Sequence, residues 1–175
     1  AVGGLFVFYN RLNDMIADRR VGPLLITKEN ISDAEIYGAE AEGRVMLPAS
    51  VALYGNLACA AGKDVKTDAD LPNIAPLNGL AGLSWGERLG PWAKLEALAA
   101  ARQDKVPENV PETAGWVTLD TRFGWKWKAS GSEQGLYAGI SNLFDKDYRN
   151  YLTTFRGTPY NEPGRSVVAG YQVSF

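Results

Sequence analysis

The last residues of the sequence alternate between apolar and polar side chains, up to the aromatic residue Phe175. Over its last eleven residues, 165–175, apolar and polar side chains fall largely on opposite faces of an extended strand. One face carries Arg165, Val167, Ala169, Tyr171, Val173 and Phe175, and the other carries Ser166, Gly170, Gln172 and Ser174 with the small apolar Val168. One face suits lipid and the other a water-filled lumen, as in a strand that crosses an outer membrane. A soluble sandwich or lipocalin strand shows the same alternation, so the rest of the chain has to decide.

Composition restricts how such a chain could cross a membrane. Its 175 residues include 18 Lys and Arg against 20 Asp and Glu, a balance that argues against nucleic acid or another polyanion as a partner. Although 46% of the residues are hydrophobic, no run approaches the roughly 18 consecutive apolar residues of a membrane helix. A membrane protein of this composition must therefore cross as strands.

Aromatic residues gather near the ends of the expected strands. They are Trp85, Trp92, Trp116, Trp125, Trp127 and Tyr148. Aromatic belts at the two membrane interfaces have this distribution. The single cysteine, Cys59, excludes an internal disulfide and a CxxC metal site, and we expect it to be a small packing residue. Segment 1–9 already has strand character and lacks the features of a signal peptide, so we expect the sequence to begin inside a larger protein.

Eight strand-like stretches follow one another along the chain. They lie at about 2–13, 31–47, 51–61, 77–86, 92–103, 116–128, 135–144 and 165–175. In the clearest one, the outward set is expected to be Val117, Leu119, Phe123, Trp125 and Trp127, and the inward set Asp120, Arg122 and Lys126. Segment 92–102 has helical propensity, but Lys94 and Glu96 alternate with apolar neighbours, which favours a strand.

The links between these stretches alternate in length. Short links rich in turn formers lie at 47–50, 86–91 and 129–134. Long links lie at about 14–30, 62–76, 103–115 and 145–164. Short turns at one end and long loops at the other are typical of bacterial outer-membrane barrels, whose long loops are extracellular. The sequence therefore predicts an all-β fold of antiparallel transmembrane β-barrel strands.

Four phrases together resemble the C-terminal part of TonB-dependent outer-membrane receptors. They are Asn30 to Glu42, Asn142-Leu-Phe-Asp-Lys-Asp-Tyr148, Glu162-Pro-Gly-Arg165 and the terminal Phe175. The resemblance covers essentially the whole of 1–175 and implies the last third of a barrel of about 22 strands, with the N-terminal plug absent. It implies localisation in the bacterial outer membrane, contact with its lipid, TonB coupling through the missing plug, insertion by the barrel-assembly machinery, and uptake of a metal complex such as a siderophore, haem, cobalamin or copper.

Several side chains are candidates for ligand contact or for assembly. The expected substrate-binding residues are Tyr151, Phe155, Arg156 and Tyr160, because exposed aromatic and Arg side chains in the last long loop offer contact area and charge-assisted bonds. The expected assembly signal is Tyr171, Val173 and Phe175, which resemble the terminal signal of bacterial barrel proteins. Segments 71–77, 101–106 and 161–165 are most similar to the copper-receptor branch of the family.

Enzymatic chemistry has little support in the sequence. The chain has no His, so Ser-His or Cys-His catalysis and imidazole-ligated metal centres cannot be built within it. Glu40 with Glu42 fits solvated lumen charges, and Asp145 with Asp147 fits a turn. For the phrase 142–148 and for Pro163-Gly164-Arg165 we expect a structural role. We expect no catalytic residue, no metal site and no cofactor.

Two other interpretations remain open at this stage. Eight strands could close into a small outer-membrane barrel with a structural or adhesion role. The same strands could also form a soluble β-barrel binding protein. Only a structure can distinguish these from a section of a larger barrel, in which the strands near Val2 and Arg165 would not pair with each other.

Overall fold

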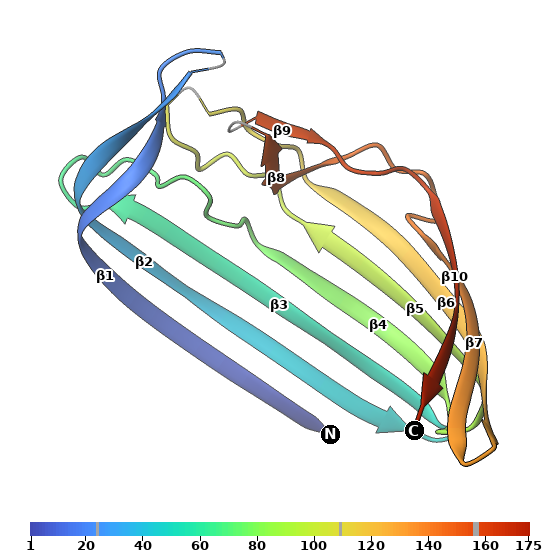
Figure 1. Ribbon diagram of the computed structural model, residues 1–175. Coiled ribbons are helices and arrows are strands. Elements are labelled where there is room, and N and C mark those ends of the chain that lie inside the picture. Colours follow the sequence, from blue (N-terminus) through green and yellow to red (C-terminus); the bar gives the residue numbers. More distant parts are fainter. Residues whose placement is uncertain (24, 109, 156–157) are drawn as a thin grey trace.

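The computed structural model describes residues 1–23, 25–108, 110–155 and 158–175, with the side chains of 17–20, 31–32, 154–155 and 158–159 outside that description. The described residues form ten strands and no helix (Figure 1). The strands are β1 (Val2–Arg20), β2 (Ile26–Leu47), β3 (Val51–Asp64), β4 (Asn78–Gly86), β5 (Gly90–Ala100), β6 (Trp116–Ala129), β7 (Ser132–Ser141), β8 (Arg149–Phe155), β9 (Thr158–Asn161) and β10 (Ser166–Ser174).

Eight of these strands form one curved antiparallel sheet. Its order is β1-β2-β3-β4-β5-β6-β7-β10, and β8 and β9 form a separate hairpin (Figure 1). The all-β, eight-stranded antiparallel prediction is confirmed. Segment 90–100 is a strand despite its helical propensity, because it pairs along its length with β4 on one side and β6 on the other. Ladder pairing outweighs the local preference of its alanines.

The pairing register divides the side chains of the sheet between two faces. On one face Lys94 lies opposite Arg122 and Glu96 opposite Asp120. We call this the polar face. On the other, the apolar face, Ala97 lies opposite Leu119 and Ala99 opposite Val117. The predicted separation of Val117, Leu119, Phe123, Trp125 and Trp127 from Asp120, Arg122 and Lys126 is confirmed.

The described part of the sheet has no central hydrophobic core. Among the described residues, the buried apolar side chains are Ala34, Ala52, Leu71 and Tyr151. Val117 is 62% exposed and Phe123 is 56% exposed on the apolar face. Large contiguous apolar patches are rare on soluble monomers, so this face indicates an apolar surrounding or a partner.

The connections differ in part from the expectation. The short turns are confirmed at 48–50, 87–89 and 130–131. The long link expected at 14–30 is wrong, because β1 and β2 continue through most of it as a two-stranded hairpin. This hairpin extends past the last β2–β3 pair, Ala34 opposite Asp64, so its backbone groups satisfy each other above the sheet. The strands β8 and β9 are a second feature that was not expected, within the last long link.

The two edges of the sheet are β1 and β10. The strand β1 pairs only with β2 in the described sheet, and β10 pairs only with β7. Figure 1 shows both chain ends at the side of the short turns. The strands near Val2 and Arg165 do not pair, as expected for a section of a larger barrel, and the sheet does not close into a small eight-stranded barrel.

Candidate functional site

Three charged or aromatic residues form a chain across the polar face. The hydroxyl of Tyr54 on β3 donates a 2.6 Å hydrogen bond to Oε1 of Glu96 on β5. The guanidinium of Arg44 on β2 lies 5.6 Å from the centre of the Tyr54 ring. Gly82 on β4 lies between Tyr54 and Glu96, and a Cβ there would come within 2.4 Å of the Tyr54 ring. The missing side chain at Gly82 therefore lets the tyrosine lie flat across β4.

A second cation and aromatic ring meet nearer the short turns. The ammonium of Lys126 lies 5.6 Å from the centre of the Trp92 ring. A Cβ on Gly124 would lie 2.9 Å from that ring, so this glycine also makes room for an aromatic side chain. The Trp92 indole nitrogen is buried without a hydrogen-bond partner among the described residues. The polar face thus places two cations, Arg44 and Lys126, over aromatic rings.

The loop after β7 is organised by Asn142. Its side-chain amide donates to the backbone oxygen of Lys146 at 2.8 Å, and its Oδ1 accepts from the Lys146 amide at 2.8 Å. Its own backbone N–H donates to Oδ1 of Asp120 at 2.9 Å. Asp145 then accepts a 2.7 Å hydrogen bond from the backbone N–H of Arg165, which joins the two ends of the last long link. The structure gives these residues the structural role that was expected.

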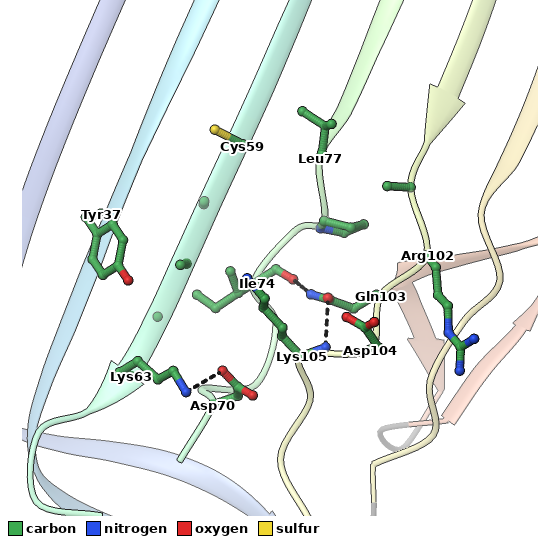
Figure 2. Close-up of a pocket in the computed structure, with 15 residues that line it drawn as sticks. Tyr37, Cys59, Lys63, Asp70, Ile74, Leu77, Arg102, Gln103, Asp104 and Lys105 are labelled. Carbon is green, nitrogen blue, oxygen red and sulfur yellow. Dashed lines mark hydrogen bonds and ion pairs between the residues drawn. The ribbon is translucent and has the colours of Figure 1, made fainter. Parts of the chain in front are cut away.

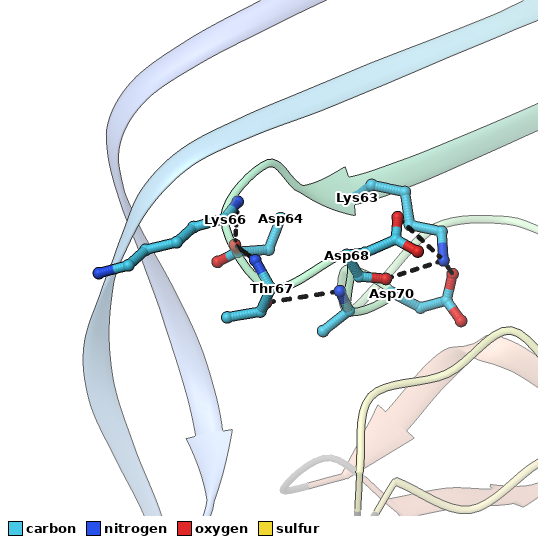
Figure 3. Close-up of polar contacts among 7 residues, drawn as sticks. Lys63, Asp64, Lys66, Thr67, Asp68 and Asp70 are labelled. Carbon is cyan, nitrogen blue, oxygen red and sulfur yellow. Dashed lines mark hydrogen bonds and ion pairs between the residues drawn. The ribbon is translucent and has the colours of Figure 1, made fainter.

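The loop after β3 is held by a small polar cluster, shown in Figure 3. Oδ1 of Asp64 accepts hydrogen bonds of 2.8 Å from the amides of Lys66 and Thr67, which turns the chain. The ammonium of Lys63 then lies 3.1 Å from Oδ1 of Asp70 and donates to the backbone oxygen of Asp68. The cluster returns the chain alongside the end of β3.

Gln103 joins this loop to the loop after β5. Its side-chain amide donates a 2.6 Å hydrogen bond to the backbone oxygen of Ile74, and its Oε1 accepts from the Lys105 amide, as Figure 2 shows. Gln103 is buried, and its backbone also pairs with Thr113. A cavity of about 430 Å³ opens beside it, lined among others by Tyr37, Lys63 and Asp70.

Residues 3–143 match the model of a protein family whose description is TonB dependent receptor-like, beta-barrel. The chain belongs to this TonB-dependent receptor family. Members of the family are outer-membrane receptors and transporters of Gram-negative bacteria. No curated protein matches the sequence.

Solved TonB-dependent receptor structures superpose on the whole chain. The copper transporter OprC matches with a TM-score of 0.85 at 24% identity, over 99% of this chain and 29% of that chain. The siderophore receptor PirA from Acinetobacter baumannii matches with a TM-score of 0.70 at 19% identity, over 99% of this chain and 29% of that one. The ferric citrate transporter FecA matches with a TM-score of 0.69 at 16% identity, over 97% of this chain and 27% of that one. The chain thus spans less than a third of these receptors and shares their barrel fold.

Within this receptor barrel, the predicted contact residues do not form one exposed cluster. Tyr151 is only 4% exposed, so the expectation that it is an exposed aromatic is wrong. Its hydroxyl meets the backbone of Asn73, which ties β8 to the loop after β3, and burial raises the pKa of Tyr151. Tyr160 is exposed as expected. Phe155 lies at the end of β8 with its side chain outside the description, and Arg156 lies outside the described residues.

The predicted assembly residues lie together at the end of β10. Tyr171 and Val173 share the apolar face, and the Tyr171 hydroxyl donates a 2.8 Å hydrogen bond to Oε1 of Gln134. The rings of Tyr171 and Trp127 are 6.3 Å apart. Phe175 is fully exposed at the chain end. Aromatic rings therefore gather where β10 runs beside the ends of β6 and β7 near the short turn.

The aromatic residues expected to form a belt do not all lie on the apolar face. Trp85 and Trp125 are exposed on the apolar face. Trp92 instead lies on the polar face opposite Gly124, and Trp116 lies on the same face opposite Ala100. Tyr148 packs on Trp116, with ring centres 4.4 Å apart. The belt assignment of Trp92, Trp116 and Tyr148 is therefore wrong. The alternation of side chains along a strand would have placed Trp116 on the polar face, because it is four residues from Asp120 and an even spacing puts both residues on the same face.

The remaining reactive side chains show no built chemical site. Glu40 and Glu42 lie on the polar face, and Cys59 is exposed opposite Ala39, with its thiol 3.6 Å from the Ala39 oxygen. In the described part of the chain, no group of three or more Cys, Asp or Glu side chains could hold a metal ion. The described residues also contain no helix with the length and apolarity needed to cross a membrane.

Proposed function

We propose that this chain is the C-terminal section of the barrel of an outer-membrane receptor that takes up a metal complex with energy from TonB. The observation that carries the proposal is an open eight-stranded antiparallel sheet with one polar and one apolar face, in a chain that belongs to the TonB-dependent receptor family. Its free edges, β1 and β10, would pair with the other strands of the complete barrel.

The two faces have different neighbours in this proposal. The apolar face, with Phe123 and Trp125, contacts the lipid of the outer membrane. The polar face lines the lumen, where Arg44, Tyr54 and Glu96 keep a hydrogen-bonded, charged wall toward the plug. TonB contacts that plug, which lies in the part of the receptor before this chain. The barrel-assembly machinery recognises the last strand through Tyr171, Val173 and Phe175.

The loops at the ends opposite the short turns contribute to ligand capture. Cross-links through Gln103 and Tyr151 hold three of these loops in one arrangement. A preordered rim lowers the entropic cost of ligand binding. Phe155 and Tyr160 belong to the β8–β9 hairpin of this rim. We propose that these two residues contact the metal complex together with Arg156, which lies outside the described residues. OprC is named a copper transporter and PirA a siderophore receptor. The ligand class that fits both names is a metal complex. We assign no catalytic role to any residue.

Uptake of a radiolabelled metal complex by intact cells tests this function. Cells that make the complete receptor should accumulate copper or a ferric siderophore above cells without it, and loss of TonB should abolish the difference. A receptor that accumulates neither, or accumulates one equally without TonB, contradicts the proposal. The control is a receptor with Glu87→Gln, a change in a short turn at the opposite end of the sheet.

A further inference from the structure

The edge strand β1 is apolar on both of its faces. Three exposed side chains stand on the apolar face of the sheet, and they are Leu5, Val7 and Tyr9. Phe6 and Phe8 alternate with them and therefore stand on the polar face, where Phe6 lies opposite Glu40 of β2. A strand that consists of a continuous apolar run is usually covered on both faces. Lipid accounts for one face of β1, so the other face needs a cover of its own.

Two glycines make room for the rings of β1 on the polar face. A Cβ on Gly38 of β2 would lie 2.6 Å from the ring of Phe8, and a Cβ on Gly4 would lie 2.9 Å from the ring of Phe6. The absent side chains therefore let both rings lie against the sheet. Phe6 is nevertheless 56% exposed, and Val2 on the same face is 71% exposed. We call Val2, Phe6 and Phe8 the β1 strip.

Other strands present a different surface on the polar face. On β5 and β6 this face carries four charged side chains, Lys94, Glu96, Asp120 and Arg122. On β10 the exposed Val168 stands alone between Ser166 and Gly170. Single exposed apolar side chains are normal on a protein surface, whereas a contiguous group marks a contact with a partner. The β1 strip is such a group.

A neighbouring strand alone would not cover the β1 strip. In the complete barrel another strand pairs with the free edge of β1, which Figure 1 shows at one side of the sheet. That strand lies in the plane of the sheet, about 4.8 Å from β1. The rings of Phe6 and Phe8 stand on the face of the sheet instead. Their cover must therefore come from inside the lumen.

The length of the related receptors leaves a segment of chain for this position. Each of the eight sheet strands takes about 22 residues with its connection, so the roughly fourteen further strands of a 22-stranded barrel need about 300 residues. The chain spans 29% of OprC, so a receptor of that length has about 430 residues outside it. About 120 residues then remain for the lumen, which is plugged in barrels of this size.

We propose that the β1 strip is a docking surface for the plug of the same receptor, which places apolar side chains against Phe6 and Phe8 and excludes water there. The inference rests on the proposed function, because a plugged receptor barrel is what sets a protein segment against this face. Burial of one phenylalanine favours the docked state about tenfold to a hundredfold. The contact therefore anchors the plug on the β1 side of the lumen, whereas the charged side chains of β5 and β6 favour water.

Photo-cross-linking in the complete receptor tests the docking surface. Benzoylphenylalanine replaces Phe6 in one variant and Leu5, which points to the opposite face, in the other. We expect the label at Phe6 to attach to a peptide of the plug, identified by mass spectrometry, and the label at Leu5 to attach to no such peptide. A label at Phe6 that reaches only lipid, a second copy of the receptor, the adjacent barrel strand or nothing at all overturns the proposal.

Substitutions measure how strongly the β1 strip holds the plug. Phe6→Ser should make channels open about tenfold more often at a fixed urea concentration, because the docked ring is lost. Phe6→Leu keeps an apolar contact and should stay close to the parent. The matched control is Val168→Ser on the same face of β10, which should leave opening unchanged. Conductance of planar bilayers counts the open channels, and heat-modifiable gel migration checks folding. Opening of Phe6→Ser as rare as in the parent, or equal to that of Val168→Ser, contradicts docking at β1.

Metal-complex uptake separates this proposal from the function. Uptake by the parent receptor, with a label at Phe6 that never reaches the plug, refutes the docking surface and leaves the transport function standing. Absence of uptake by the parent, with a label at Phe6 that attaches to the plug, refutes the transport proposal and supports the docking surface.

Discussion

The hydroxyl of Tyr54 reaches across β4 to donate a 2.6 Å hydrogen bond to Glu96. The intervening residue is Gly82, where a Cβ would come within 2.4 Å of the tyrosine ring. The polar face is therefore built as interlocked pairs, in which a glycine on one strand accommodates the ring of its neighbour. Gly170 beside Tyr137 repeats the arrangement on β10, where a Cβ would again meet the ring at 2.4 Å.

Gly82→Ala should destabilise the complete receptor. The new methyl group would force the Tyr54 ring from its position and break its bond with Glu96, at a cost of about 1–3 kcal/mol. Urea unfolding in lipid vesicles, followed by tryptophan fluorescence, measures the change. The matched control is Gly43→Ala, where the nearest atom would be 3.8 Å away, and an equal loss in both variants would count against the ring-over-glycine explanation.

Asn142→Ala should loosen the last long link. The substitution removes both side-chain bonds to the backbone of Lys146. It also places alanine, which tolerates the left-handed region less well than asparagine, at a φ of +51°. The expected loss in free energy of unfolding is about 1–3 kcal/mol. Limited proteolysis of the folded receptor should show faster cleavage between 142 and 165. Asn142→Gly tolerates the same φ but lacks the amide; cleavage as slow as in the parent would show that the amide bonds do not hold the link.

Leu119→Lys should destabilise the barrel in a bilayer. The side chain lies on the apolar face opposite Ala97, and a lysine near the bilayer midplane costs about 2–4 kcal/mol. Glu40→Lys places the same ammonium on the polar face and should cost much less. Reversible unfolding in vesicles compares the two, and a neutral Leu119→Lys would argue against lipid on this face.

Deletion of Phe175 should impair insertion without affecting ligand contact. The residue is exposed at the end of β10, at the position where an aromatic ring anchors a barrel at the interface. Heat-modifiable gel migration of membrane fractions should show less folded receptor over time, while binding of metal complex per folded molecule stays constant. Ser174→Ala serves as the control, and folded yields of the deletion equal to those of the parent would refute an assembly role.

The strand pattern was predictable where alternation is strong. Segment 90–100 is a strand because Lys94 and Glu96 alternate with apolar residues, and this signal proved stronger than helical propensity. The extension of β1 and β2 into 14–30 was not predictable in the same way, because its Asp, Asn, Gly and Pro residues also favour loops. Only pairing between the two strands, beyond the rest of the sheet, makes that segment extended.

The arrangement of the candidate site depended on contacts between distant segments. Tyr151 is buried and its hydroxyl interacts with the backbone of Asn73, and Gln103 joins two loops through the backbone of Ile74. Neither residue has a local sequence signal for such a contact. The pairing of Tyr54 with Glu96 becomes visible only once the register places Gly82 between them. A glycine opposite an aromatic residue on the neighbouring strand, as Gly82 is opposite Tyr54, is the sequence signal for such a pair.

Two adjacent residues on β6 allow a direct test of whether this strand lies between lipid and a water-filled lumen. In a Cys59→Ser background, spin labels at Phe123 and at Arg122 of the complete receptor in lipid vesicles report access to oxygen from lipid and to a water-soluble nickel complex. We expect a lipid-exposed label at Phe123 and a water-exposed label at Arg122, because the two side chains point to opposite faces. Equal access of the nickel complex to both labels would contradict a barrel strand between lipid and lumen.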